Sequence, residues 1–116
     1  MREYVKQKWL EALRSGEYPE GNNYLLKYGH FSPLGVLCEI ARQHAIVAFV
    51  GYDRSGAGIY DRTENLLLPP NVRAWAGISS STGRYVSRRG SVLDDSNRNF
   101  LGFQRIADEI ERHDIV

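Results

Sequence analysis

Arginines and tyrosines are the residues of this chain best suited to binding a ligand. A guanidinium group binds a phosphate through two parallel hydrogen bonds, and a tyrosine ring stacks on a base while its hydroxyl remains available. The candidate ligand-binding residues are Arg14, Tyr18, Tyr28, Arg84, Arg88 and Arg89. Together they predict a site for a small anionic, nucleotide-like ligand. The alternative for the two tyrosines, which lie in a polar segment, is that their rings pack against the edge of the core.

No catalytic or metal-binding motif is complete. The segment 95–106 begins like a calcium loop, but Phe100 replaces the glycine of the sharp turn and Ile106 replaces the closing glutamate, so we expect an Asx-rich turn. Cys38 and His44 are six positions apart, whereas metal-binding pairs on one helix face are three or four apart. We therefore predict no catalytic residue, no cofactor and no metal, and a protein that is not an enzyme.

The overall charge is nearly balanced. The 15 Lys and Arg residues against 14 Asp and Glu residues give a net charge of +1 and a pI of about 7.9. Dedicated nucleic-acid-binding domains are more basic and DNA mimics are strongly acidic, so direct DNA binding is not expected. The single cysteine indicates a reducing compartment, and the charged N-terminal segment lacks the apolar region of a signal peptide. No apolar run approaches the roughly 18 residues of a membrane span, so we expect a cytoplasmic protein without a membrane partner.

The length fits a single domain over residues 1–116. Ser32 and Pro33 are a typical helix start, because serine caps free amide groups and proline at the first helical position loses no hydrogen bond. Gly16 is a typical helix end, since glycine adopts the left-handed conformation without strain. Apolar residues at helical spacing predict helices over 2–15, 33–43, 71–76 and 103–113.

The predicted strands are short. The apolar run 45–50 is rich in β-branched and aromatic residues and predicts a buried strand. The glycine-rich segment 51–58 lacks the Lys-Ser/Thr pair and the helix start of a phosphate-binding loop, so it predicts a hairpin turn. Further short strands are predicted within 24–28, 59–60, 66–68, 85–87 and 91–93. These elements predict an α+β fold of about three helices packed on a small, mostly antiparallel sheet.

Several separated blocks resemble a known family. They are Trp9-x-x-Ala-Leu-Arg-Ser-Gly-x-Tyr18, Leu34-Gly-Val-Leu-Cys-Glu39, Leu68-Pro-Pro-x-Val-x-x-Trp-Ala-Gly77, Leu93-x-Asp95 and Phe103-x-x-Ile-Ala-Asp-x-Ile-Glu111. Their order resembles an uncharacterised family of small proteins encoded by bacteriophages and prophages. The resemblance implies an accessory viral protein that acts in the cytoplasm of the bacterial host and counters host defence. Ser32 and Pro33 stand where such proteins often have cysteines, Glu20-Gly21 stands where Gln-Gly is common, and segment 45–65 has no counterpart.

Two functions of different classes follow. In the first, the chain binds and sequesters the nucleotide-like ligand, for which a pocket at a homodimer interface would be a common arrangement. The alternative is a protein–protein inhibitor of a host defence effector such as a CRISPR or nuclease complex, using an aromatic surface with charged rims. A pocket lined by arginine and tyrosine would favour the first, and a flat aromatic patch the second. A small hydrolase or transferase is less favoured, because the adjacent carboxylates of Asp94 and Asp95 would diverge on a turn.

Overall fold

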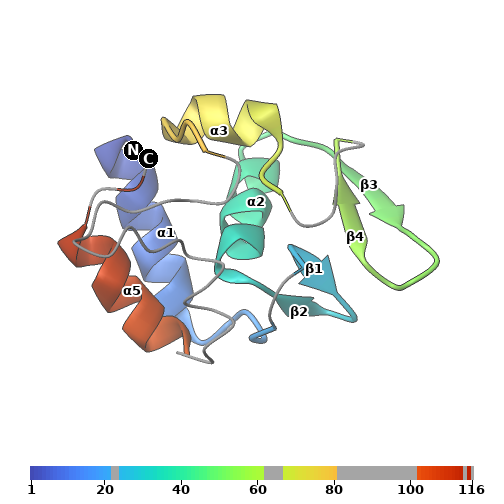
Figure 1. Cartoon of the computed structure of the whole chain (residues 1–116), viewed down its shortest axis with the longest axis horizontal. Helices are drawn as coiled ribbons and strands as arrows, with labels where there is room; N and C mark the ends of the chain where they lie inside the picture. The colour runs from blue at the N-terminus through green and yellow to red at the C-terminus, as the bar shows by residue number, and fades with distance from the viewer. Residues whose placement is uncertain (22–23, 62–66, 81–101, 114, 116) are drawn as a thin grey trace.

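Helix α2 (Pro33–Gln43) lies in the middle of the molecule, between the other helices and two β-hairpins (Figure 1). The computed structural model describes residues 1–21, 24–61, 67–80, 102–113 and 115. The other elements, in chain order, are α1 (Glu3–Ser15), β1 (Leu26–Lys27), β2 (His30–Phe31), β3 (Phe49–Tyr52), β4 (Gly58–Tyr60), α3 (Pro70–Ala76) and α5 (Phe103–Arg112). The predicted α+β class is confirmed, with four helices and two antiparallel two-stranded sheets among the described residues.

The helices follow the sequence prediction closely, and so do their ends. The Ser32 hydroxyl accepts a hydrogen bond from the amide of Gly35 at 3.1 Å, which caps α2. Gly16 and Gly77 end α1 and α3 with φ angles of 77° and 75° in the left-handed region. The apolar residues predicted to face inward from α2 and α5 are all buried: Val36, Leu37, Ile40, Ala41, Phe103, Ile106, Ala107 and Ile110.

Helix α1 packs on the start of α2 through a buried tryptophan. Trp9 is completely buried, and its indole Nε1 donates a hydrogen bond to the carbonyl oxygen of Pro33 at 2.8 Å. Tryptophan carries a large apolar surface together with one donor that needs a partner when buried, and the first turn of α2 supplies that partner. Trp75, the other tryptophan of the chain, is only half-buried and lies edge-on to Tyr4.

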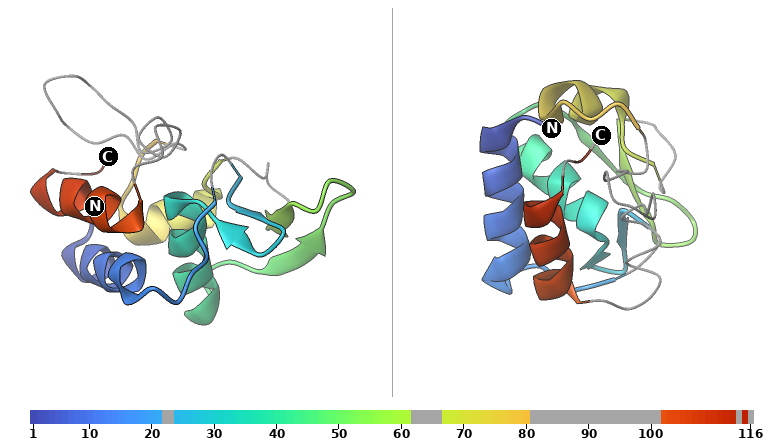
Figure 2. Two further views of the ribbon diagram at one scale, coloured as in Figure 1. Left: turned by 90° about the horizontal axis from the view of Figure 1, so that it is seen from below. Right: turned by 60° about the vertical axis from the view of Figure 1, so that its left-hand side comes forward.

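Helix α5 lies beside α1 and runs antiparallel to it, which brings the two chain ends together (Figures 1 and 2). The amino group of Met1 donates to the carbonyl of Ile115 at 3.1 Å, and Lys6 Nζ donates to the carbonyl of His113 at 3.2 Å. At the opposite end, the Glu20 carboxylate accepts a hydrogen bond from the amide of Phe103 at the beginning of α5. A carboxylate at this position satisfies a free amide and complements the helix dipole. Glu20, singled out by its motif position, therefore joins the loop after α1 to α5.

The two hairpins lie next to each other on the far side of α2. Strands β1 and β2 are joined by Tyr28 and Gly29, whose φ angles of 51° and 79° are both positive, as a type I′ hairpin turn requires. Strands β3 and β4 form the second hairpin, and an antiparallel bridge between Lys27 and Ala57 links the two. The β3–β4 hairpin projects from the end of the molecule opposite α1 and α5 (Figures 1 and 2).

The prediction of a buried strand over 45–50 is wrong. The amide of Ile46 donates to the carbonyl of Ala41 at 2.9 Å, and Ala45 adopts a φ of 60°, so this segment closes the end of α2. The strand therefore starts only at Phe49, and Phe49 and Val50 are exposed. The physical reason is that the last carbonyls of a helix need donors, and here the chain directly after α2 supplies them.

Several predicted elements cannot be compared with the structure. The strands predicted at 85–87 and 91–93 and the turn at 94–99 lie outside the described residues. Residues 67–68, the described part of the strand predicted at 66–68, are not in a strand.

Glycine at position 35 is expected to be essential for stability. A Cβ atom at Gly35 would lie 1.6 Å from the carbonyl oxygen of Leu25. Alanine at this position would therefore force the backbone at Leu25, directly before β1, away from α2. In an unobstructed helix, alanine stabilises by roughly 0.5–1 kcal/mol relative to glycine. Here we expect Gly35→Ala to lower the free energy of unfolding by about 2 kcal/mol or more, measured by urea denaturation.

Gly16→Ala is the matched control, because a Cβ there meets nothing within 4 Å and only the positive φ is unfavourable. It should cost about 1 kcal/mol. A stabilising effect of Gly35→Ala would contradict the close packing of Leu25 on α2.

Candidate functional site

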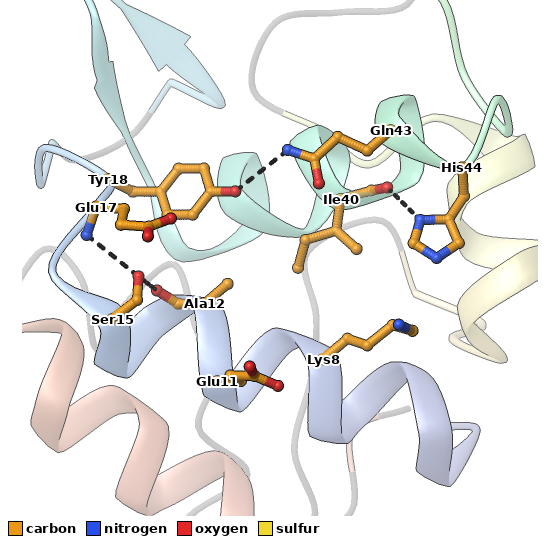
Figure 3. A pocket seen from close by; sticks show the side chains of 9 residues that line it. All are labelled: Lys8, Glu11, Ala12, Ser15, Glu17, Tyr18, Ile40, Gln43 and His44. Carbon is orange, nitrogen blue, oxygen red and sulfur yellow. Dashed lines mark hydrogen bonds between the residues drawn. The ribbon is translucent and has the colours of Figure 1, made fainter.

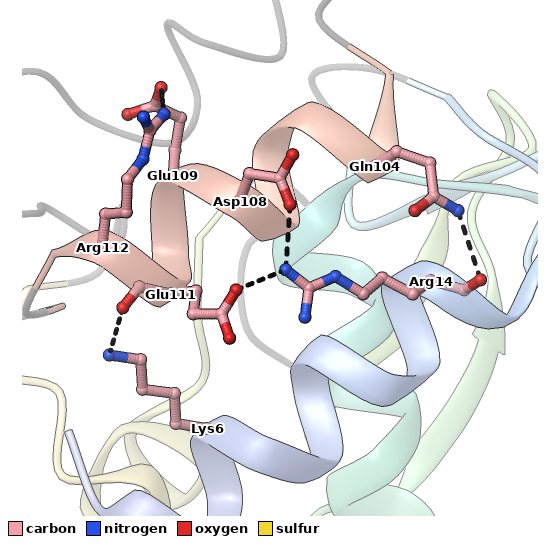
Figure 4. A network of polar contacts seen from close by, with 7 residues as sticks. All are labelled: Lys6, Arg14, Gln104, Asp108, Glu109, Glu111 and Arg112. Atoms are coloured by element: carbon pink, nitrogen blue, oxygen red, sulfur yellow. Dashed lines mark hydrogen bonds and ion pairs between the residues drawn. The ribbon is translucent and has the colours of Figure 1, made fainter.

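Arg14, the first predicted ligand-binding residue, is held in an ion-pair network between α1 and α5 (Figure 4). Its Nη2 atom lies 2.9 Å from Asp108 Oδ1 and 2.7 Å from Glu111 Oε2, and its carbonyl accepts a hydrogen bond from Gln104. These two carboxylates raise the pKa of the guanidinium above its usual value, through hydrogen bonds first and charge second. The Arg14 side chain, which the sequence predicted to bind a phosphate, thus forms ion pairs with two carboxylates of α5.

Tyr18 lies at a cavity of about 240 Å³ between α1 and α2, beside Gln43 and Ser15 (Figure 3). Its hydroxyl accepts a hydrogen bond from Gln43 Nε2 at 3.5 Å, and its ring lies edge-on to Phe31 with the centroids 5.4 Å apart. The ring is half-buried against the core edge, which is the alternative that sequence analysis left open for the tyrosines. Arg14 does not line this cavity.

Tyr28 lies elsewhere, at the tip of the β1–β2 hairpin. The side chain is 72% exposed, and its ring lies against Gly56 in the turn of the second hairpin. The Tyr28 amide also donates to the Gly56 carbonyl at 3.2 Å. The structure therefore does not bring Arg14, Tyr18 and Tyr28 into one pocket. The three remaining predicted residues, Arg84, Arg88 and Arg89, lie outside the described residues, as do Asp94 and Asp95.

An exposed apolar surface gathers at the hairpin end of the molecule, and sequence analysis missed it. We call this the hairpin surface; it consists of Tyr28, Phe49, Val50 and Tyr52, with exposures of 72%, 37%, 55% and 59%. The rings of Phe49 and Tyr52 are 5.3 Å apart and nearly perpendicular, while Phe49 also contacts the buried ring of Tyr60 at 5.5 Å. The Phe49 ring therefore packs between the buried ring of Tyr60 and the exposed ring of Tyr52.

Local sequence fixes the shape of this hairpin. Asp53 Oδ1 accepts hydrogen bonds from the amides of Ser55 and Ala57 at 2.8 and 3.1 Å, which closes the turn. The pairing of β3 with β4 shifts between Phe49 and Gly51, so Val50 is a bulged residue. A bulge twists a strand and redirects a side chain. The Asp-x-Ser-Gly turn was readable from the sequence, but the exposure of the preceding apolar run was not.

Two basic side chains, Lys27 and Arg54, lie beside the hairpin surface, and the turn also contains the acidic Asp53. Lys27 Nζ lies 4.1 Å from the centre of the Tyr24 ring and 5.6 Å from that of Tyr28, and Arg54 is exposed in the turn. Among the described residues, no carboxylate forms an ion pair with Lys27 or Arg54. The hairpin surface therefore combines aromatic groups with two cations that form no ion pair among the described residues.

Two buried ionisable groups lie behind the hairpin, where α2 meets β4. Desolvation is the main cause that raises the pKa of the Cys38 thiol far above its usual range, and the neighbouring Glu39 charge adds to it. Burial and Glu39 likewise raise the pKa of Tyr60, whose hydroxyl donates to Glu39 Oε2 at 3.3 Å. Arg42 Nε binds the same carboxylate at 3.0 Å. A thiol this buried and neutral behaves as a small apolar group rather than as a nucleophile.

Neither a metal-binding cluster nor a membrane-spanning helix is found in the described part of the chain. No group of three or more His, Cys, Asp or Glu side chains there could hold an ion. None of its helices has the length and apolar character needed to cross a bilayer.

These features define a small α+β domain with two candidate binding surfaces. One is the hairpin surface with its exposed aromatic side chains, and the other is the cavity between α1 and α2. The chain belongs to the family described as "Domain of unknown function (DUF8296)", whose model matches residues 1–114. No curated protein and no solved structure matches the sequence.

Arg14 is expected to contribute to stability through α5. Its partners are 61% and 57% exposed, so Arg14→Met should lower the free energy of unfolding by about 0.5–1 kcal/mol, with a smaller loss at high salt. Arg112→Met is the control, because Arg112 pairs with Glu109 within the same helix. An equal loss for both variants would argue against a role for Arg14 in joining the two helices.

Stability is expected to fall at alkaline pH. The native state holds the Cys38 thiol and the Tyr60 hydroxyl in their neutral forms, whereas the unfolded chain releases these protons above about pH 8.5 and pH 10. The contribution is complete below those values and is lost as pH rises, by up to about 1.4 kcal/mol per pH unit for each group.

Urea denaturation between about pH 8 and pH 11 measures this effect. Cys38→Val keeps the apolar volume and removes the thiol, so its stability should fall less steeply between about pH 8.5 and pH 10. Identical slopes for the variant and the parent would show that the thiol ionises equally in both states.

Proposed function

We propose that this chain is a protein-binding module that contacts an acidic partner protein through the hairpin surface. The observation that carries the proposal is the exposure of Phe49, Val50 and Tyr52 on the projecting β3–β4 hairpin, and of Tyr28 at the tip of the neighbouring β1–β2 hairpin. Aromatic residues are enriched at the energetic centres of protein interfaces, and the packed rings of Phe49 and Tyr52 expose such groups to solvent. The resemblance to phage accessory proteins then suggests an inhibitor that blocks a host defence effector such as a nuclease or CRISPR complex.

The conformation of Tyr28 adds support. Asparagine and glycine are the usual residues at the first central position of a type I′ turn, since a positive φ is unfavourable for a bulky side chain. Tyr28 adopts a φ of 51° and yet exposes most of its ring. One side of the ring lies against Gly56, and the exposed remainder is open to a partner. Backbone strain of this kind is often found at binding sites.

Charge specifies the kind of partner. Lys27 and Arg54 flank the hairpin surface without a carboxylate partner among the described residues, while the turn's own Asp53 carboxylate is occupied by amides of the hairpin. A partner with acidic groups around an apolar depression would therefore be attracted and oriented by these two cations.

The nucleotide-like ligand, predicted first from sequence, has less support from the described residues. Arg14 is paired with two carboxylates on α5, and Tyr18 and Tyr28 lie at different places. That site stays a prediction, together with the homodimer that would complete it.

The proposal is tested by binding measurements with two serine substitutions on the hairpin. The full chain, immobilised, is used to isolate a binding protein from host bacterial lysate, and the purified pair is then titrated by calorimetry. We expect Val50→Ser with Tyr52→Ser to weaken the pair at least about tenfold, because the apolar contact is lost from side chains that are already solvated in the free chain. Arg54→Glu should slow association, with a smaller effect at high salt.

Tyr4→Ser is the matched control, since Tyr4 is 52% exposed on α1, at the opposite end of the molecule. It should leave affinity unchanged. Full binding by the hairpin variant would refute the proposal, and a concentration-dependent dimer abolished by that variant would identify a second copy as the occupant. A thermal shift of several degrees with nucleotides, lost in Arg14→Ala, would favour ligand sequestration instead.

A further inference from the structure

The cavity between α1 and α2 has opposite charges along its length. Lys8, Glu11, Ala12 and Ser15 recur at the spacing that places side chains on one face of a helix, and Glu17 follows the end of α1. Figure 3 shows Lys8 with His44 at one end and Glu17 with Tyr18 at the other. Ile40 and Ala12 supply apolar surface between these ends.

The charged groups of the cavity have no partners among the described residues. Neither Lys8 nor the carboxylates of Glu11 and Glu17 form an ion pair or a side-chain hydrogen bond there. Lys8 and Glu11 are three residues apart on the helix, a spacing at which an ion pair would be possible, and yet they do not form one. Both signs of charge therefore remain available to a ligand.

The polar groups of the cavity are already oriented. His44 Nδ1 is 3.0 Å from the carbonyl of Ile40, which can only accept, so the hydrogen lies on Nδ1 and Nε2 is left for another contact. The His44 ring also packs on Trp75, with centroids 5.6 Å apart. At the other end, Tyr18 accepts from Gln43 and keeps its own proton to donate.

We propose that this cavity binds a small linear zwitterion, such as an ω-amino acid or a short peptide with free ends. The anionic end would lie near Lys8 and the cationic end near Glu17, with the connecting chain on Ile40 and with Glu11 partway along the lining, one helical turn from Lys8. One lysine against two glutamates gives the lining a net negative charge, which disfavours a phosphate-bearing ligand. A volume of about 240 Å³ is below the roughly 300–1,000 Å³ of pockets for drug-sized molecules, which suits a ligand of this size.

The test uses three probes that share a linear six-carbon chain and differ in the charged end groups that they carry: 6-aminohexanoate, hexanoate and hexylamine. Binding to the full chain is followed by NMR shifts of the backbone amides of Ala12, Ile40 and Gln43. We expect 6-aminohexanoate to bind with a dissociation constant near the millimolar range, and each singly charged probe to bind about five- to tenfold more weakly. Lys8→Gln should reduce the affinity for 6-aminohexanoate to that of hexylamine, and Glu17→Gln should reduce it toward that of hexanoate.

Lys6→Gln is the control, because Lys6 lies on the same helix but donates to carbonyls at the end of α5, away from the cavity. It should leave all three affinities unchanged. Equal binding of hexylamine and 6-aminohexanoate, equal binding of hexanoate and 6-aminohexanoate, or no binding by any probe up to about 10 mM would each overturn the proposal. The hairpin variant Val50→Ser with Tyr52→Ser should bind 6-aminohexanoate normally, so this proposal and the proposed function can fail separately.

Discussion

The first turn of α2 packs directly against the backbone at Leu25, and this contact joins the helices to the first hairpin. Gly35 has no side chain, so the Leu25 carbonyl can lie where a Cβ would otherwise be, and Ser32 donates its amide to that same carbonyl at 3.3 Å. On the other side of this turn, Trp9 binds the Pro33 carbonyl. One helical turn thus holds α1 and the first hairpin together, and a packed core transmits any displacement there to both.

Polar contacts then attach the C-terminal helix at both of its ends. Glu20 binds the amide at the start of α5, Arg14 pairs with two carboxylates along it, and Lys6 binds carbonyls where it ends. The apolar face of α5 supplies the burial, and these contacts set its register on α1. Trp9 and Arg14, which belong to the block from Trp9 to Tyr18 that resembles the phage family, therefore have structural roles. The candidate binding sites are then the hairpin surface and the α1–α2 cavity.

Both candidate surfaces contain exposed groups whose internal contacts, among the described residues, leave part of each surface open to solvent. The hairpin surface exposes aromatic rings beside two cations, and the cavity exposes charges of both signs above an apolar residue. Placing such groups in solvent contributes nothing to folding, whereas each can contribute to recognition. Their separation on the molecule would allow a protein partner and a small ligand to be bound independently.

The helices, their ends and the apolar stripes of α2 and α5 could be predicted from local sequence, because capping, left-handed glycine and helical periodicity are local properties. It also indicated the hairpin turn at Asp53. Tertiary structure alone decided that Arg14 pairs with α5, that Tyr18 and Tyr28 lie apart, and that the apolar run ending at Val50 is exposed. The reason is that the partner and the burial of a residue depend on which distant segments of the chain fold against it. The residue type determines only which kinds of group the side chain can bind.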